Sequence, residues 1–511
     1  MVQLLHYSGH IRNHKALCKE LGITAPLSRT EREAAILLCG YERWGREIGL
    51  HLHGMFAFAL KDGDTGEIVC VRDPFGAKPF YYAVKEDGSL LFGTQIRDIL
   101  KAGYPKVLNR KMLQIYLTMT YTTGEETFFE GIRKLLPGRV MTFKDGALDI
   151  ERYWKPQFAP DTSKTLEEWA DEIHSTLGQI MQEVKDEDET VESFLSGGVD
   201  SSYVLAVSDC EACNSCGYDD SRLDESGLAR ETAELLGRRF NRCLVTPERY
   251  FEAIPYVMEH MEQPLGDASA VCFAIGCIET AKHTGICYSG EGADEFFGGY
   301  NMYRNATRYG ENLPTFYVGN TNIMKEDEKK AILTEYTEDF LPIDLVRPLY
   351  EENAALDPLS KMMDIDIQVW LEGDIYLNVD KMSRAAGLEV RMPLTDRRIF
   401  DIAARIPSEF KVNDTQNKVA LRTAANKVLP EAIAFRQKLG FVVPIRVWMA
   451  DERYNADVRR LFRSDLAAKF FDRDAIWAIF EEYIGGNSDN WRKVYVIYAF
   501  LVWYEIYFEK A

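Results

Sequence analysis

The chain has 511 residues, of which 46% are hydrophobic and 27% charged, as in a globular protein of two or three domains. A net charge of −20 excludes nonspecific binding to nucleic acid, which needs a positive face. We see no signal peptide, and the apolar run 494–504 is too short to cross a bilayer, so we expect a cytoplasmic protein without a membrane partner.

The first part of the chain, residues 1–154, has the pattern of an antiparallel sheet. Short runs of alternating hydrophobic residues are separated by Asp-Gly pairs at 62–63, 87–88 and 145–146, which are typical of hairpin turns. A helix is expected near residues 31–44. Residues 156–164 (PQFAPDTSK) form a Pro- and Ser-containing linker, which we take as the domain boundary.

The second part, residues 165–511, alternates helices with short apolar strands. The expected strands cover 191–195, 213–217, 242–245 and 285–288. This βαβ order predicts an α/β fold with a doubly wound parallel sheet and helices on both faces. From about residue 356 onward the pattern is nearly all helical, which indicates a helical C-terminal extension.

One of these strands runs into a loop that is suited to phosphate. The segment FLSGGVDSS (194–202) places a Ser-Gly-Gly turn between a strand and a helix, where backbone N–H groups and the helix dipole favour an anion. It lacks the lysine of a Walker loop. The alternative is a glycine turn that only caps a helix, but the strand before the loop favours phosphate. The expected ATP-binding residues here are Leu195, Ser196, Gly197, Gly198, Asp200, Ser201 and Ser202.

Three cysteines, Cys210, Cys213 and Cys216, have a spacing that a zinc or iron–sulfur site could use. No second paired motif follows to complete such a site. The cluster also lies where a buried strand is expected, so we interpret these cysteines as small apolar core residues.

Several segments together resemble the asparagine synthetase family, within the wider group of ATP pyrophosphatases. The resemblance rests on SGGVDSS (196–202), EQPLGDASA (262–270), YSGEGADEFFGGY (288–300), DKMS (380–383), LEVRMP (388–393) and RQK (436–438). It covers essentially the whole chain, and the ordered set of motifs is highly specific. It implies a ligase that uses ATP and Mg²⁺ to activate a carboxylate as an acyl-adenylate, before ammonia displaces AMP.

The resemblance also implies roles for individual residues. Asp200 and Asp294 would hold Mg²⁺, and Glu291 would orient or deprotonate the incoming nitrogen. Lys438 would be the cation beside the adenylate phosphate. Further nucleotide contacts would come from Ser289 and Gly290 and from the backbones of Leu195 and Cys216, while Glu295 and Glu389 are expected to be structural ion-pair partners.

In this family the front domain is similar to a glutaminase whose nucleophile is an N-terminal cysteine. Here residue 2 is Val, and the opening residues resemble a segment from within that domain. Ser8 replaces an oxyanion-hole Asn, His10 replaces a Glu, and Thr30-Glu31 occupies the place of the residues that hold the glutamine amine. Cys18 lies on an expected helix. We therefore expect a truncated front domain that has lost glutaminase activity.

Three functions remain open. The first is an asparagine synthetase-like ligase acting on aspartate or another carboxylate, with ammonia that is free or supplied by a separate glutaminase. The second is an intramolecular amide-forming cyclase, similar to β-lactam synthetases and lasso-peptide cyclases, and the third a non-catalytic scaffold subunit. Glu291 favours ammonia chemistry because β-lactam-type relatives typically carry Tyr there. Gln263 and Asn378 depart from the family pattern at the aspartate pocket. A homodimer is possible.

Overall fold

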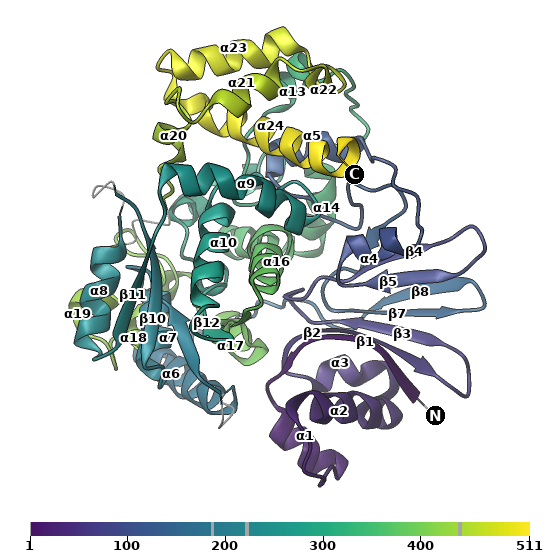
Figure 1. The fold of residues 1–511 in the computed structure, drawn as a ribbon. Coiled ribbons are helices and arrows are strands. Elements are labelled where there is room, and N and C mark those ends of the chain that lie inside the picture. Colours follow the sequence, from purple (N-terminus) through teal and green to yellow (C-terminus); the bar gives the residue numbers. More distant parts are fainter. Residues whose placement is uncertain (1, 185–188, 220–223, 438–441, 511) are drawn as a thin grey trace.

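The computed structural model of the chain describes residues 2–184, 189–219, 224–437 and 442–510. Figure 1 shows an antiparallel front part and a larger part in which helices surround a second sheet. The expected combination of an antiparallel and a parallel sheet is confirmed. Within the described residues, no helix is both long enough and apolar enough to cross a membrane.

The front part contains a five-stranded sheet of order β1-β2-β3-β7-β8 and a three-stranded sheet of order β5-β4-β6. All their strand pairs are antiparallel. The strands are β1 (Val2–Ile11), β2 (Gly54–Asp62), β3 (Ile68–Arg72), β4 (Tyr81–Val84), β5 (Leu90–Gly93), β6 (Arg133–Lys134), β7 (Arg139–Lys144) and β8 (Ala147–Arg152). The helices are α1 (His14–Leu21), α2 (Arg29–Trp44), α3 (Ile48–His51), α4 (Ile96–Lys101) and α5 (Lys111–Met119).

The Asp-Gly turns behave differently from one another. Asp145 and Gly146 both have positive φ, 52° and 81°, and join β7 to β8 as a two-residue hairpin. Gly88, with φ of 80°, provides the turn between β4 and β5. Between β2 and β3 the residue with positive φ is Gly66, at 73°, and not the expected Gly63. The longer loop shifts the position that needs glycine by three residues.

The second sheet is parallel and has the order β11-β10-β9-β12-β13. Its strands are β9 (Val191–Phe194), β10 (Ala212–Gly217), β11 (Arg239–Leu244), β12 (Ile286–Tyr288) and β13 (Glu389–Arg391). Helices α8 and α10 both contact β10 and lie on opposite sides of it in Figure 1. The sequence pattern missed β13, because its three residues lie inside a region that is otherwise helical.

The remaining helices form the layers around this sheet and the C-terminal extension. In chain order they begin with α6 (Leu166–Glu183), α7 (Val199–Val207), α8 (Ser226–Leu235), α9 (Pro247–Met261), α10 (Ser269–Thr280), α11 (Ala293–Phe297), α12 (Ala306–Tyr309), α13 (Glu326–Ile332) and α14 (Pro342–Glu352). Then follow α15 (Pro358–Ile365), the π-helix η4 (Asp366–Tyr376), α16 (Leu377–Ala386), α17 (Arg397–Ala403), α18 (Val419–Ala425), α19 (Glu431–Ala434), α20 (Ile445–Trp448), α21 (Ala456–Phe462), α22 (Asp465–Ala468), α23 (Arg473–Ile484) and α24 (Trp491–Tyr504). As expected, α24 is buried along most of its length.

Ion pairs that all have the same orientation of charge join the two parts of the chain. In each of these pairs the cation comes from the front part and the carboxylate from the part after residue 165. They include Arg12–Asp396 (3.3 Å), Arg29–Glu389 (2.8 Å), Arg72–Glu372 (2.9 Å), Lys78–Asp380 (2.8 Å), Arg97–Glu262 (2.9 Å) and Lys134–Glu372 (3.1 Å). Glu262, Glu372, Asp380 and Asp396 are all buried. Breaking a buried pair costs about 3–5 kcal/mol, because the remaining charge stays in a poorly solvated site.

The Lys78–Asp380 pair gives a test of this interface. Burial alone would raise the pKa of Asp380, but Lys78 and Arg384 lower it below its ordinary value. We expect Lys78→Met to lower the free energy of unfolding at pH 7 by about 3 kcal/mol, measured by urea denaturation. A carboxyl group with a lowered pKa stabilises the fold above its unfolded-state pKa of about 4 and loses that effect as the pH falls. The difference between variant and wild type should therefore shrink in acid.

The matched control is Lys330→Met, which removes an exposed pair with Glu338. Exposed pairs contribute about 0–1 kcal/mol, so this variant should unfold near the wild-type midpoint. Equal effects of the two substitutions would contradict a stabilising role for the interface.

Candidate functional site

The loop between β9 and α7 is held by its own serines. The Ser196 N–H donates to Ser201 Oγ at 3.0 Å, and the Gly198 N–H donates to Ser196 Oγ at 3.1 Å. Ser202 Oγ donates to the Gly198 carbonyl at 2.8 Å. The Leu195 N–H continues the sheet by donating to the Asn214 carbonyl at 2.9 Å. The hydroxyl groups therefore fix the shape of the loop, as well as offering polar atoms at the start of α7.

The end of β12 brings a second turn onto this loop. The Ser289 N–H donates to the Arg391 carbonyl at 2.9 Å. A Cβ on Gly290 would lie 2.7 Å from the Ser201 nitrogen, so only glycine allows this approach. The structure thus brings Ser289 and Gly290 beside Asp200 and Ser201 at the carboxyl edge of the parallel sheet, where open α/β sheets bind their ligands.

Two carboxylates face each other at this edge with a lysine between them. Lys418 Nζ lies 2.5 Å from Asp200 Oδ2 and 2.8 Å from Asp294 Oδ1, and its side chain is 2% exposed. Burial lowers the pKa of Lys418, but the two carboxylates outweigh this and raise it above its usual value. A Cβ on Gly299 would lie 1.8 Å from Asp294 Oδ1 and 2.1 Å from Lys418 Cε, so a glycine is required beside the pair.

This arrangement fits a divalent cation. A positive group already lies between the two carboxylates, and Asp200 Oδ1 is buried without a hydrogen-bond partner among the described residues. Within the same residues no group of three His, Cys, Asp or Glu side chains could hold a metal alone. Mg²⁺ is usually held by one or two carboxylates together with substrate phosphates, so Asp200 and Asp294 are suited to hold it only with a phosphate ligand present.

The other acidic residues of this segment differ in their surroundings. Glu291 follows the β12 turn, and its N–H donates to Ser289 Oγ at 3.4 Å. Glu295 is buried and accepts a hydrogen bond from Tyr300 at 2.5 Å, and burial together with Asp294 raises its pKa to about 8. Glu389 forms the expected ion pairs, with Arg29 and with Arg391.

The prediction for Lys438 lies outside the described residues. The segment that precedes it contacts the phosphate loop, since Arg436 Nη1 donates to the Gly197 carbonyl at 3.4 Å. The Arg436 carbonyl in turn accepts a hydrogen bond from Arg422 Nη1 at 2.9 Å.

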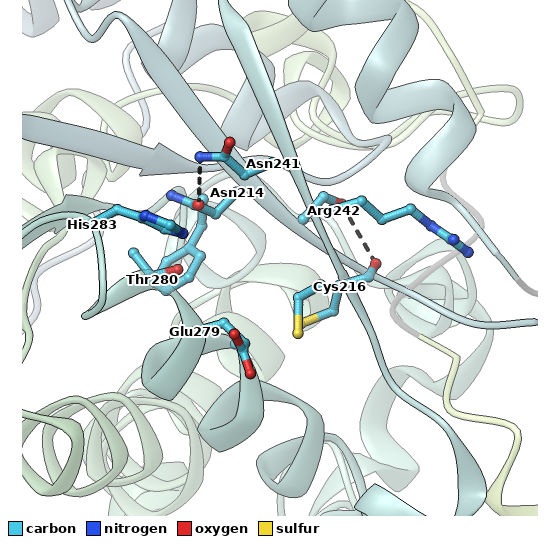
Figure 2. Close-up of a pocket in the computed structure, with 11 residues that line it drawn as sticks. Asn214, Cys216, Asn241, Arg242, Glu279, Thr280 and His283 are labelled. Atoms are coloured by element: carbon cyan, nitrogen blue, oxygen red, sulfur yellow. Dashed lines mark hydrogen bonds between the residues drawn. The ribbon is translucent and has the colours of Figure 1, made fainter.

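Cys216 points away from this edge of the sheet. A pocket of about 80 Å³ lies between β10, β11 and α10, and its lining includes Asn214, Cys216, Asn241, Glu279 and His283 (Figure 2). This volume is far below the roughly 300–1,000 Å³ of typical small-molecule sites. The Cys216 side chain thus faces a small cavity under α10, which leaves only its backbone for the expected contact with adenine.

The cysteine cluster does not converge on one point. Cys213 and Cys216 are three residues apart on β10, so their side chains leave opposite faces of the strand. Burial raises the pKa of Cys210 to about 11 and that of Cys213 to about 12. With a raised pKa these thiols stay protonated at neutral pH, which agrees with their interpretation as core residues.

In the front part, Ser8, His10 and Glu31, which replace residues of the family's glutamine pocket, all form hydrogen bonds within this chain. His10 and Glu33 are buried together at 3.1 Å, and Glu33 also accepts hydrogen bonds from Tyr7 and the Ile11 N–H. Ser8 Oγ accepts a hydrogen bond from Arg384 Nη2 at 2.9 Å. Elsewhere in this part, Glu31 forms a capping box with Ser28 at the start of α2. Glu31 therefore stabilises the N-terminus of α2.

Sequence reasoning missed Lys418 and Arg384. Nothing in the sequence around Lys418 distinguishes it from a surface lysine. Its φ of 58°, a conformation usually taken by glycine or asparagine, could not be foreseen for a lysine either. Arg384 directly follows the DKMS motif, but its partner Ser8 lies in the other part of the chain. Both positions depend on contacts between segments that are distant in sequence.

Comparison with known proteins gives two family matches. The Asparagine synthase family matches residues 172–505, and the Glutamine amidotransferase domain family matches residues 2–154. Asparagine synthetase [glutamine-hydrolyzing] 1 of Bacillus subtilis is 30% identical, with 99% of this chain and 85% of that protein aligned. A putative asparagine synthetase [glutamine-hydrolyzing] of Mycobacterium tuberculosis has the same identity and coverage.

More distant relatives differ in their names. Amidase chyE of Penicillium rubens is 22% identical over 83% of this chain and 71% of its own length. A solved structure of an allosteric regulatory enzyme of purine biosynthesis aligns with 14% identity and a TM-score of 0.22, covering 47% of this chain and 44% of that one.

The lysine between the carboxylates can be tested without turnover. Lys418→Met would leave Asp200 and Asp294 facing each other without a counter-charge. We expect it to lower the free energy of unfolding by about 3 kcal/mol in EDTA, measured by urea denaturation. Because Mg²⁺ can replace the missing positive charge, MgCl₂ should stabilise the variant more than the wild type.

Lys427→Met is the control, since Lys427 pairs with the largely exposed Asp171 and should have a small effect. Wild-type stability of Lys418→Met in EDTA would show that the lysine does not neutralise the carboxylate pair.

Proposed function

Because the chain belongs to the asparagine synthase family, we propose that it is an ATP-dependent, amide-forming ligase. It activates a carboxylate, in the first place the side chain of aspartate, and transfers ammonia to it. The observation that carries this proposal is the contact between the Ser196–Ser202 loop and the 289–291 turn, with Asp200 and Asp294 facing each other across it.

The first step needs an electrophilic phosphorus and a leaving pyrophosphate. The N–H groups at the start of α7, with the helix dipole, suit the phosphates of ATP, and Asp200 and Asp294 suit the Mg²⁺ that accompanies them. In this step a carboxylate oxygen attacks the α-phosphorus, and the bond to the β-phosphate oxygen breaks. The products are an acyl-adenylate and pyrophosphate. If Asp200 and Asp294 held Mg²⁺, they would have a second counter-charge, and Lys418 would be available to pair with the phosphates.

The second step forms the amide. Ammonia attacks the acyl carbon, the carbon–oxygen bond to AMP breaks, and a base takes the proton that the nitrogen loses. Glu291 is the proposed base, because it lies in the turn beside Asp294 and the phosphate loop. Lys438 remains the proposed cation beside the phosphate that leaves with AMP.

We propose that the front part does not hydrolyse glutamine. Ser8 accepts a hydrogen bond from Arg384, and His10 pairs with Glu33, so both side chains are engaged with groups of this chain, which supports the proposal. Ammonia would come from solution or from a separate glutaminase. An intramolecular cyclase is the second possibility. Glu291 argues against it, because β-lactam-type relatives typically carry Tyr at that position.

The proposed ligase can be tested by pyrophosphate release. With ATP, Mg²⁺, aspartate and ammonium chloride, we expect pyrophosphate and AMP in equal amounts, together with asparagine. Asp294→Ala should reduce the rate by at least about 10³-fold, because it removes half of the carboxylate pair that would hold the metal.

Asp465→Ala, at a fully exposed carboxylate in α22, is the matched control and should keep the wild-type rate. The proposal fails if the wild type releases no pyrophosphate that depends on aspartate. Release with another carboxylate but without any need for ammonia would point to the cyclase.

The nitrogen donor is tested separately. We expect glutamine alone to support less than about 1% of the rate seen with ammonium, since Ser8 and His10, which replace residues of the family's glutamine pocket, are engaged with Arg384 and Glu33. The measurement is glutamate release, followed in parallel with asparagine formation. Glutamate released in step with asparagine would contradict the proposed loss of glutaminase activity.

A further inference from the structure

The π-helix η4 carries a buried carboxylate with no visible partner. Asp374 is fully buried, and neither of its oxygens has a hydrogen-bond partner among the described residues. An isolated ionised carboxylate in such a place is strongly unfavourable unless a cation or donor meets it. π-helices are rare and are often found at functional sites, so this carboxylate calls for a functional explanation.

Most of the other groups near Asp374 are acceptors as well, and the nearby Tyr121 hydroxyl, which has no partner among the described residues, can accept as well as donate. Burial raises the pKa of Asp374 well above its ordinary value, and the charges of Asp267 and Glu295 raise it further. Asn378 follows one turn later on the same continuous helix, and its Oδ1 is also buried without a partner among the described residues. These four residues, Asp267, Glu295, Asp374 and Asn378, are called the acidic cluster below.

The acidic cluster lies beside the proposed reaction site. Helix α11 packs against η4, and it carries Asp294 and Glu295. On the other side, a Cβ on Gly373 would lie 2.4 Å from the Tyr121 ring, and the Gly266 N–H donates to the Thr120 carbonyl at 2.7 Å. Segment 120–122 of the front part therefore covers the cluster, next to Asp267.

We propose that the acidic cluster binds an ammonium group, and that Asp374 is its main anchor. An excess of acceptors favours a ligand that only donates hydrogen bonds, and an ammonium group carries a positive charge and only N–H donors. The inference rests on the proposed function, which supplies two sources of this group. One is the ammonium ion that provides the nitrogen, and the other is the α-ammonium group of the amino acid that is activated.

Asp374→Asn tests the proposal, since it removes the charge and keeps the shape. If the ammonium ion is the ligand, the KM for ammonium should rise at least 10-fold, while kcat at saturating ammonium changes less than about 3-fold. If the α-ammonium group is the ligand, the KM for aspartate should rise instead. The KM for ATP should stay unchanged in either case.

The matched control is Asp364→Asn. Asp364 is also buried on the preceding helix, and burial raises its pKa to about 7, but its Oδ2 accepts hydrogen bonds from Asn353 and Gln368. It lies outside the acidic cluster, so its substitution should leave the KM values for ammonium and aspartate unchanged.

A binding measurement without ATP separates this proposal from the proposed function. The melting temperature of the wild type should rise more in ammonium chloride or in aspartate than in sodium chloride of the same ionic strength, and Asp374→Asn should lose that difference. If Asp374→Asn does not fold, Asn378→Leu should show the same loss to a smaller extent. Unchanged KM values and an unchanged melting difference in these variants would overturn the proposal, even if the ligase reaction is observed.

Discussion

The buried ion pairs between the two parts of the chain are the constraint on which the rest of the structure depends. Cations from the front part meet carboxylates from the part that carries the parallel sheet, and most of these carboxylates are buried. Removing either partner leaves an unpaired charge in a poorly solvated place. The front part therefore acts as a counter-charge for a strongly acidic second part.

The same electrostatic logic extends into the site at the sheet edge. Asp200 and Asp294 approach each other because Gly290 and Gly299 leave no side chain between the turns, and Lys418 neutralises the pair. The close packing of these turns thus brings two negative charges together, and a lysine of this chain lies between them. Further along the same region, Asp374 has no such cation among the residues that the structure describes, and this difference distinguishes the two groups of carboxylates.

Much of this could be predicted from the sequence where the signal is local. Alternating apolar residues and Asp-Gly pairs indicated the antiparallel sheet, and short apolar runs placed four strands of the parallel sheet to within about three residues. The Ser-Gly-Gly loop lies where a strand meets a helix. Features that depend on distant contacts could not be predicted. Gly66 replaces Gly63 because of loop length, β13 is too short to show a period, and Lys418 and Arg384 have partners more than a hundred residues away.

Arg384 also bears on any attempt to redesign the front part. Its guanidinium group bonds Ser8 on β1 and also pairs with Asp380, which Lys78 holds from the front part. Grafting a nucleophile near Ser8 would meet a guanidinium group in the same space. Replacing Arg384 to make room would take one of its two close cations from Asp380. A designer would therefore have to rebuild the charge balance of the interface before new chemistry could be added to it.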